Sequence, residues 1–204
     1  MRNKREIILL AVVFISILVS LYFDGNIVRI TSLIRTNFLN SFFLGITFLS
    51  SEIIIFFLLT SMFLWSENKR RWILPLWLTL FLSAVVGFLL KFMVQRPRPF
   101  QLGIVSTLPA LMEKSFTTWN FSFPSFQSML VFCAMPILIK EFPKLKYFWI
   151  TFAVLVAFSR VYFGLHFMSD VIAGGLIGYL IGIIVIKYEK ESRIGENIYR
   201  RIFG

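Results

Sequence analysis

The sequence predicts an all-α fold: a polytopic membrane helix bundle of six transmembrane helices, in a single domain over residues 1–204. Of the 204 residues, 58% are hydrophobic, and the mean hydropathy is +0.81. A soluble domain is typically about 45–50% apolar. Because one membrane-spanning helix needs about 20 residues, this length suits five or six spans joined by short loops. We therefore expect the lipid bilayer to surround most of the chain.

Six apolar runs define the predicted spans. The first, Ile7–Phe23, follows a basic start and has no small-residue cleavage site after it, so we interpret it as an uncleaved span rather than a signal peptide. A polar loop is expected from Asp24 to about Asn40. The other predicted spans are about Phe42–Trp65, Trp72–Val94, Pro124–Ile139, Tyr147–Phe163 and Phe167–Ile186, and a charged tail follows from Lys187. Glycines 174, 175, 178 and 182 predict close helix packing in the sixth span.

The distribution of the net charge of +11 predicts the orientation. Fourteen lysines and arginines fall in the first segment, the tail and the connections on one side, and seven fall on the other side. The positive-inside rule places the richer side, with both termini, in the cytoplasm. Much of the charge is thus a topology signal. It requires no nucleic-acid partner, and we expect none.

Four of the seven cations on the predicted outer side lie at span ends: Lys91, Arg96, Arg98 and Arg160. Arginine offers a planar fork of donors that matches phosphate oxygens, and lysine adds a point charge. Snorkelling to the interface explains one such cation well, but it explains a group of them poorly. Glu52 in the second span has three readings that the sequence leaves open: a partner for an outer cation, part of a lipid entry path, or a packing residue.

His166 is the only histidine, and it lies between the fifth and sixth spans at the same outer edge. Asp170 follows four residues later, which is one helical turn if the sixth span begins near His166. A carboxylate that binds one imidazole nitrogen fixes the tautomer and makes the other nitrogen more nucleophilic. The pair therefore predicts a nucleophile and the residue that orients it.

The fourth span opens with Pro124 and Ser125 at this same edge. Ser125 can cap the helix, or it can bind an anion together with backbone N–H groups. The ends of spans three to six thus bring polar residues to one side at one depth. This convergence predicts an anion-binding pocket that contains a nucleophile.

These residues resemble the type 2 phosphatidic acid phosphatase family of membrane lipid phosphatases. The first family block, Lys, six residues and Arg-Pro, matches Lys91 with Arg98-Pro99. The second, Pro-Ser-Gly-His, is represented by Pro124-Ser125-Phe126-Gln127. The third, Ser-Arg, five residues, His, three residues and Asp, matches Ser159-Arg160, His166 and Asp170. The matching blocks run from residue 91 to residue 170, and the six-span layout extends the likeness to nearly the whole chain.

The resemblance implies metal-independent phosphoryl transfer, with no cofactor, on a phosphorylated membrane lipid at the extracytoplasmic face of the cell membrane. His166 would attack phosphorus to form a phosphohistidine, and Asp170 would orient it. Lys91, Arg98, Arg160 and Ser125 would hold the phosphoryl oxygens. The implied substrates are a phosphatidylglycerol phosphate, an undecaprenyl diphosphate, or both.

Gln127 and Phe126 depart from the family's His and Gly. Gln127 cannot donate a proton with a suitable pKa, and general acid catalysis contributes about 10²–10⁴-fold. A leaving phosphate with a pKa of about 6 scarcely needs that proton, so we hypothesise a shift toward diphosphate lipids. A positioned water could also supply the proton, so monoesters remain candidates. The alternative function is a non-catalytic relative that binds or carries phospholipid headgroups. A transporter is a weaker alternative, because the first three spans lack a matching glycine pattern.

Overall fold

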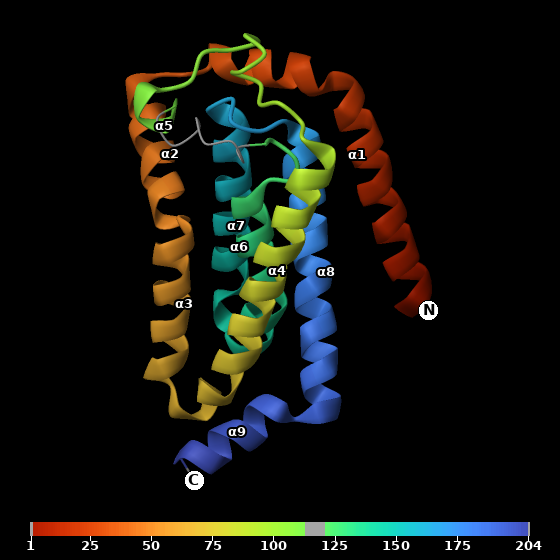
Figure 1. The fold of residues 1–204 in the computed structure, drawn as a ribbon, viewed down its shortest axis with the longest axis vertical. Coiled ribbons are helices and arrows are strands. Elements are labelled where there is room, and N and C mark those ends of the chain that lie inside the picture. The colour runs from red at the N-terminus through yellow and green to blue at the C-terminus, as the bar shows by residue number, and fades with distance from the viewer. Residues whose placement is uncertain (1, 113–120, 204) are drawn as a thin grey trace.

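The computed structural model describes residues 2–112 and 121–203, and within these ranges it contains helices and no strands (Figure 1). The all-α prediction is confirmed for the described residues. The helices are α1 (Arg2–Leu33), α2 (Asn37–Leu49), α3 (Glu52–Trp65), η1 (Glu67–Trp72), α4 (Ile73–Val94), α5 (Pro109–Met112), α6 (Phe126–Glu141), η3 (Pro143–Leu145), α7 (Lys146–Tyr162), α8 (Met168–Ser192) and α9 (Ile194–Phe203).

Three segments of the described chain are long and apolar enough to cross a membrane: Glu67–Val94, Pro143–Tyr162 and Met168–Ser192. The helices α2 and α3 would supply a fourth span if the pair, bent by 63° at its break, crosses as one unit. The protein is therefore a membrane helix bundle with three or four candidate spans among the described residues, and the count of six stays a prediction.

The predicted polar loop after the first span is wrong, because α1 continues through it to Leu33. The buried residues Ser20, Asp24, Val28 and Thr31 recur every three or four positions, which places them on one helix face. This stripe packs against α8, so the polar residues in it contact protein rather than water. Figure 1 shows the second half of α1 turning across the top of the bundle.

The predicted second span is broken into α2 and α3 at Ser50 and Ser51. The Ser50 hydroxyl donates to the Thr47 carbonyl at 3.1 Å, and the Ser51 N–H donates to the Phe48 carbonyl at 3.0 Å. Such short-range bonds compete with the regular helical ladder. Glu52 therefore begins α3, where a carboxylate is favoured by the helix dipole.

The centre of the bundle is the close contact between α6 and α8. A Cβ atom added at Gly174, Gly178 or Gly182 would meet the carbonyl oxygen of Ser125, Met129 or Cys133, respectively. These glycines are four residues apart, and so are the three carbonyls. The predicted close packing of this span is therefore confirmed, and it leaves no room for side chains between the two backbones.

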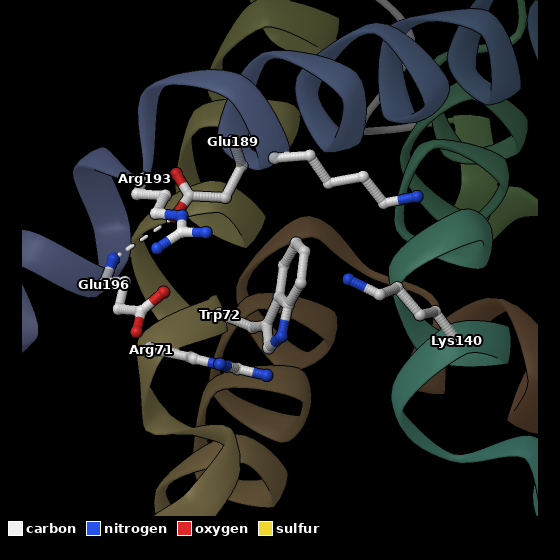
Figure 2. A pocket seen from close by; sticks show the side chains of 7 residues that line it. Arg71, Trp72, Lys140, Glu189, Arg193 and Glu196 are labelled. Atoms are coloured by element: carbon white, nitrogen blue, oxygen red, sulfur yellow. Dashed lines mark hydrogen bonds between the residues drawn. The ribbon is translucent and has the colours of Figure 1, made fainter.

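The packing of α4, α6, α7 and α8 defines two ends of the bundle. The end of α4, the start of α6, the end of α7 and the start of α8 lie together at one end, at the top of Figure 1. We call this the site end. At the opposite end, which we call the α9 end, α9 lies across the bundle, and side chains from η1, α6, α8 and α9 surround a cavity (Figure 2).

Candidate active site at one end of the bundle

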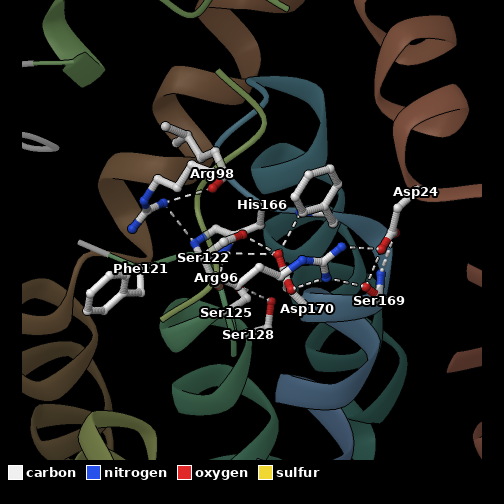
Figure 3. Close-up of polar contacts among 12 residues, drawn as sticks. Asp24, Arg96, Arg98, Phe121, Ser122, Ser125, Ser128, His166, Ser169 and Asp170 are labelled. Atoms are coloured by element: carbon white, nitrogen blue, oxygen red, sulfur yellow. Dashed lines mark hydrogen bonds and ion pairs between the residues drawn. The ribbon is translucent and has the colours of Figure 1, made fainter. Parts of the chain in front are cut away.

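His166 lies in the loop between α7 and α8 and is only 3% exposed. Its backbone N–H donates to the Arg160 carbonyl at 3.2 Å. The imidazole Nδ1 lies 2.6 Å from the Ser122 carbonyl, and Nε2 lies 3.1 Å from Nη1 of Arg98 (Figure 3). A carbonyl can only accept, so Nδ1 carries the proton. The lone pair of Nε2 therefore faces the Arg98 guanidinium.

The environment of His166 disfavours its protonated form. Burial is the main cause that holds the pKa of His166 well below its usual value of 6.5, and the positive charges of Arg98, Lys91 and Arg160 add to it. The imidazole is thus neutral at physiological pH. A neutral imidazole with a free Nε2 lone pair is the form that can act as a nucleophile.

Arg98 reaches the imidazole from the segment that follows α4. This helix ends at Val94, and Gln95 caps it in the left-handed conformation with φ 49°. Nη1 of Arg98 also donates to the Leu165 carbonyl at 2.9 Å. Burial lowers the pKa of Arg98 to about 10, so the guanidinium remains charged at neutral pH. Pro99, which follows it, is buried.

Arg160 lies in the last turn of α7 and is 8% exposed. Its Nε and Nη1 atoms are buried and have no hydrogen-bond partner among the described residues. The carboxylate of Glu52 interacts favourably with the Arg160 guanidinium through its negative charge. Buried polar atoms are nearly always satisfied, and an exception calls for an explanation. An anion beside His166 would supply the missing acceptors.

Lys91 lies in the last turn of α4 and is half-buried. Its Nζ donates to the Phe121 carbonyl at 2.5 Å. Phe121 directly precedes Ser122, whose carbonyl binds the imidazole. Lys91 thus helps to fix the strand-like segment before α6 and adds a third positive charge near His166.

Asp170 is fully buried in the first turn of α8 and does not bind the imidazole directly. Its Oδ2 atom lies 4.0 Å from Nδ1 of His166. This oxygen instead accepts from the Ser122 hydroxyl and, at 2.8 Å, from the N–H of Phe167. The expected shared helix face does not form, because α8 begins after His166. Asp170 is therefore linked to His166 through Ser122, whose hydroxyl donates to the carboxylate and whose carbonyl accepts from Nδ1.

Arg96 connects Asp170 to α1, and sequence reasoning did not assign it to the site. Its Nη1 donates to Oδ1 of Asp170 at 2.7 Å, and its Nη2 donates to Oδ2 of Asp24 at 2.8 Å. Asp24 also accepts from the N–H and the hydroxyl of Ser169. The arginine thus joins two buried carboxylates from different helices (Figure 3). Two features of the sequence could have indicated this contact: Arg96 is a cation on the predicted outer side, and Asp24 directly follows the first apolar run.

The remaining predicted residues lie close to this network or support it. Ser125 is fully buried, and its N–H donates to the Asp170 carbonyl at 3.1 Å. Its hydroxyl accepts from Ser128 at 3.0 Å rather than capping α6. The Ser159 hydroxyl donates to the Val156 carbonyl at 2.7 Å and accepts from the Thr47 hydroxyl of α2 at 3.3 Å, so it links α7 to α2.

Pro124 is buried and directly precedes Ser125, the N-cap of α6, and Gln127 lies in the first turn of that helix. The Oε1 atom of Gln127 is buried and has no hydrogen-bond partner among the described residues. An amide can form hydrogen bonds, but it does not transfer a proton at neutral pH.

The site thus combines a neutral imidazole nitrogen with a buried arginine, Arg160, two of whose nitrogens have no acceptor among the described residues. Such an arrangement suits a tetrahedral oxyanion in contact with Nε2 of His166. In residues 2–112 and 121–203, no three His, Cys, Asp or Glu side chains converge in a way that could hold a metal ion.

The family model of the PAP2 superfamily matches residues 72–194. The chain is 31% identical to the phosphatidylglycerophosphatase B of Bacillus subtilis, over 83% of this chain and 85% of that protein. It is 30% identical to the undecaprenyl-diphosphatase of Sulfolobus acidocaldarius, over 66% of this chain and 64% of that protein.

Two solved structures share the fold. The PAP2-type phosphatidylglycerolphosphate phosphatase from Bacillus subtilis has a TM-score of 0.69 and 24% identity, over 89% of this chain and 96% of that one. Aquifex aeolicus LpxE has a TM-score of 0.65 and 27% identity, over 81% of this chain and 96% of that one.

We predict that the imidazole of His166 stays neutral, with its proton on Nδ1, well below pH 6.5. The physical reason is its burial beside three cations and its bond to the Ser122 carbonyl. Since His166 is the only histidine, ¹⁵N-histidine labelling in micelles gives one pair of ring signals. Ring ¹⁵N signals at the chemical shifts of imidazolium at pH 6 would contradict the prediction that His166 stays neutral.

We predict that Arg96→Ala destabilises the protein by about 3–5 kcal/mol, because it leaves two buried carboxylates without their cation. For a chain of this size, the unfolding temperature would fall by roughly 10 °C. Thermal unfolding in detergent measures this. Arg29→Ala is the matched control, because Arg29 is exposed on α1 and its side chain makes no hydrogen bond within residues 2–112 and 121–203. Equal shifts in the two variants contradict the role of Arg96.

Proposed function

This chain belongs to the PAP2 superfamily of membrane phosphatases, and we propose that it removes phosphate from a phosphorylated membrane lipid through a phosphohistidine at His166. The observation that carries this proposal is the placement of Nε2 of His166. It lies 3.1 Å from the Arg98 guanidinium, and the Arg160 guanidinium of the same site has two buried nitrogens without acceptors.

In the proposed first step, the lone pair of Nε2 attacks phosphorus, and the bond from phosphorus to the leaving oxygen breaks. The leaving group takes that electron pair, and Nδ1 keeps its proton against the Ser122 carbonyl. Arg98, Arg160 and Lys91 stabilise the charge on the phosphoryl oxygens, which is most of what phosphoryl transfer asks of a protein. The phosphate would replace Nε2 as an acceptor for Arg98.

In the second step, water attacks phosphorus and the bond from phosphorus to Nε2 breaks. Its electron pair returns to the imidazole, inorganic phosphate leaves, and the surplus proton of the water passes to solvent. Asp170 takes no proton in this scheme. It fixes Ser122, and through that carbonyl it fixes the orientation of His166. No metal ion is required at either step.

The substrate class follows from Gln127. An alkoxide leaving from a monoester needs a proton, whereas a phosphate leaving from a diphosphate does not. We therefore assign the chain a preference for a lipid diphosphate, such as undecaprenyl diphosphate, over a monoester such as phosphatidylglycerophosphate. The phosphatidylglycerophosphatase B and the undecaprenyl-diphosphatase to which the chain is similar are named for one substrate of each kind.

The orientation is also part of the proposal. The α9 end carries the cation-rich connections, so it faces the cytoplasm in a cell membrane with both termini, under the positive-inside rule. The site end then faces the extracytoplasmic side. The predicted six spans are compatible with this arrangement, in which α1 and α6 would cross together with the candidate spans.

We predict that His166→Ala lowers phosphate release by about 10⁴-fold or more, because the covalent nucleophile is lost. Arg160→Gln should cost about 10²–10³-fold, as expected for one donor to a developing oxyanion. Purified protein in detergent, with chelator present, is assayed on phosphatidylglycerophosphate and undecaprenyl diphosphate. Arg29→Gln removes an exposed arginine and serves as the control.

Phosphate release that persists in His166→Ala contradicts the phosphohistidine. No release from either lipid by the wild-type protein would favour the alternative function, a relative that binds or carries headgroups. Loss of activity on addition of chelator would overturn the metal-independent step.

We predict that Gln127→His raises the rate on monoesters more than the rate on diphosphates, by about 10-fold or more. The added imidazole can protonate an alkoxide, and a leaving phosphate gains little from it. The measurement is the ratio of kcat/KM for the two lipids in each protein. Gln127→Asn, which restores no proton donor, is the control. An equal rise for both lipids removes the basis for the diphosphate preference.

A further inference from the structure

The α9 end holds a polar cavity, at the opposite end of the bundle from His166. It has a volume of about 390 Å³. Figure 2 shows side chains from separate parts of the chain that point into one space. The residues that line the cavity are Arg71, Trp72, Lys140, Glu189, Lys190, Arg193 and Glu196.

The acidic residues of this cavity are already engaged. The carboxylate of Glu189 accepts the N–H groups of Gly195 at 3.0 Å and Glu196 at 3.2 Å, and so it caps the start of α9. Glu196 forms an ion pair with Arg200 at 2.7 Å. These two carboxylates are therefore held by the local structure of α8 and α9.

The cations of the cavity are not matched in the same way. The side chains of Arg71, Lys190 and Arg193 make no hydrogen bond or ion pair within residues 2–112 and 121–203. Lys140 lies 3.6 Å from the centre of the Trp72 ring and 3.7 Å from a carboxylate oxygen of Glu141. The cavity thus gathers four positive charges, three of which have no protein acceptor.

Trp72 adds a donor that lacks a partner. The residue is 4% exposed, and its Nε1 atom is buried without a hydrogen-bond partner among the described residues. Figure 2 shows the indole between Lys140 and Glu196, with its nitrogen on the side of Arg71. A buried indole N–H normally finds an acceptor, and an acidic oxygen in this cavity would supply it.

Arg193 occupies a position that favours glycine. It ends α8 in the left-handed conformation, with φ 49°. This conformation costs a residue with a Cβ atom roughly 1–2 kcal/mol, and glycine is common there. An arginine here adds a cation that the helix dipole favours, and its side chain lines the cavity.

The placement of α9 puts the cavity at the level of lipid headgroups. A Cβ atom at Gly195 would meet the Arg71 carbonyl at 2.8 Å, so α9 is pressed closely onto η1. Ile194 and Ile198 of α9 are 38% and 40% exposed. A helix that lies across the end of a membrane bundle with apolar residues on its free surface is typical of the interface.

We propose that this cavity binds the phosphate of an anionic lipid headgroup in the leaflet at the α9 end. The forked donors of Arg71 and Arg193, the ammonium of Lys190 and the indole N–H of Trp72 match the acceptor oxygens of a phosphodiester. A soluble phosphate compound has the same chemistry, and the experiment separates the two sources. This site is independent of the reaction at His166.

The test is native mass spectrometry of the full chain in detergent, titrated with phosphatidylinositol and, separately, with phosphatidylcholine. Phosphatidylinositol is an anionic phosphodiester without a terminal phosphate for the site end to remove. The pocket variant carries Arg71→Gln, Lys140→Gln, Lys190→Gln and Arg193→Gln. The control variant carries Lys144→Gln, Lys146→Gln, Lys187→Gln and Arg201→Gln, which removes equal charge from exposed positions at the same end.

We expect the pocket variant to bind phosphatidylinositol about tenfold more weakly than the control variant does, with phosphatidylcholine binding unchanged in both. Equal losses in the two variants would assign the effect to general surface charge and overturn the proposal. Displacement of phosphatidylinositol by excess inorganic phosphate in the wild-type protein would overturn the lipid assignment in favour of a soluble phosphate compound.

A single variant guards against misfolding of the pocket variant. Arg193→Gly places the residue favoured by the left-handed conformation at the end of α8, so the unfolding temperature should hold or rise. Its affinity for phosphatidylinositol should still fall severalfold. Unchanged affinity in this folded variant contradicts the role of Arg193 in the cavity.

Discussion

The buried carboxylate of Asp170 is the contact on which the geometry of the site end depends. It binds Arg96, the Ser122 hydroxyl and the N–H of Phe167, and it is fully shielded from water. Hydrogen bonds are strong in such an environment, and their loss is correspondingly costly. Because the Ser122 carbonyl binds Nδ1 of His166, the tautomer of the imidazole depends on a carboxylate that does not bind it directly. The same group also links α1 to α8 through Arg96 and Asp24.

The site end divides its positive charge between two functions. Arg96 is paired with two carboxylates and contributes to the structure rather than to anion binding. Arg160 has no such acceptor for two of its nitrogens, and Arg98 faces the imidazole. Keeping a guanidinium buried without an anion costs free energy. A phosphoryl group that binds beside Arg160, as proposed, would supply the missing acceptors and remove that cost.

The sequence predicted the helices of the bundle core well and their long-range polar contacts poorly. The ends of α4 and α7 and the start of α8 lie within a few residues of their predicted positions, because long apolar runs, Pro97 and the polar residues that follow them mark those boundaries. The end of α8 was predicted too early, because the helix continues past Ile186 through charged residues to Ser192. The extension of α1 was not predicted, because the polar residue Asp24 was expected to lie in a loop. Asp24 is instead buried and hydrogen-bonded to Arg96 and Ser169, which lie 72 and 145 residues away, and a single sequence carries no signal for such pairs. The spacing of His166 and Asp170 predicted a direct bond on one helix, whereas the helix begins only after His166. The first-turn position of Gln127 was predictable, but the lack of a partner for its Oε1 atom was not.

The cations at the two ends of the bundle differ in their exposure to solvent, and this difference affects which anions each end can bind. Arg98 and Arg160 are each 8% exposed, so water and salt screen them little, and their fixed directions select a shape of anion. Arg71, Lys190 and Arg193 at the α9 end are exposed, where the Debye length of about 8 Å at physiological ionic strength limits their reach. The site end therefore has the buried, preorganised groups that the proposed stabilisation of a transition state requires. The cations around the cavity at the α9 end would favour an anionic headgroup over a zwitterionic one through their placement as well as their net charge. Because α4, α6 and α8 run between the two ends, and glycine contacts lock α8 onto α6, one rigid packing fixes the position of both sets of cations.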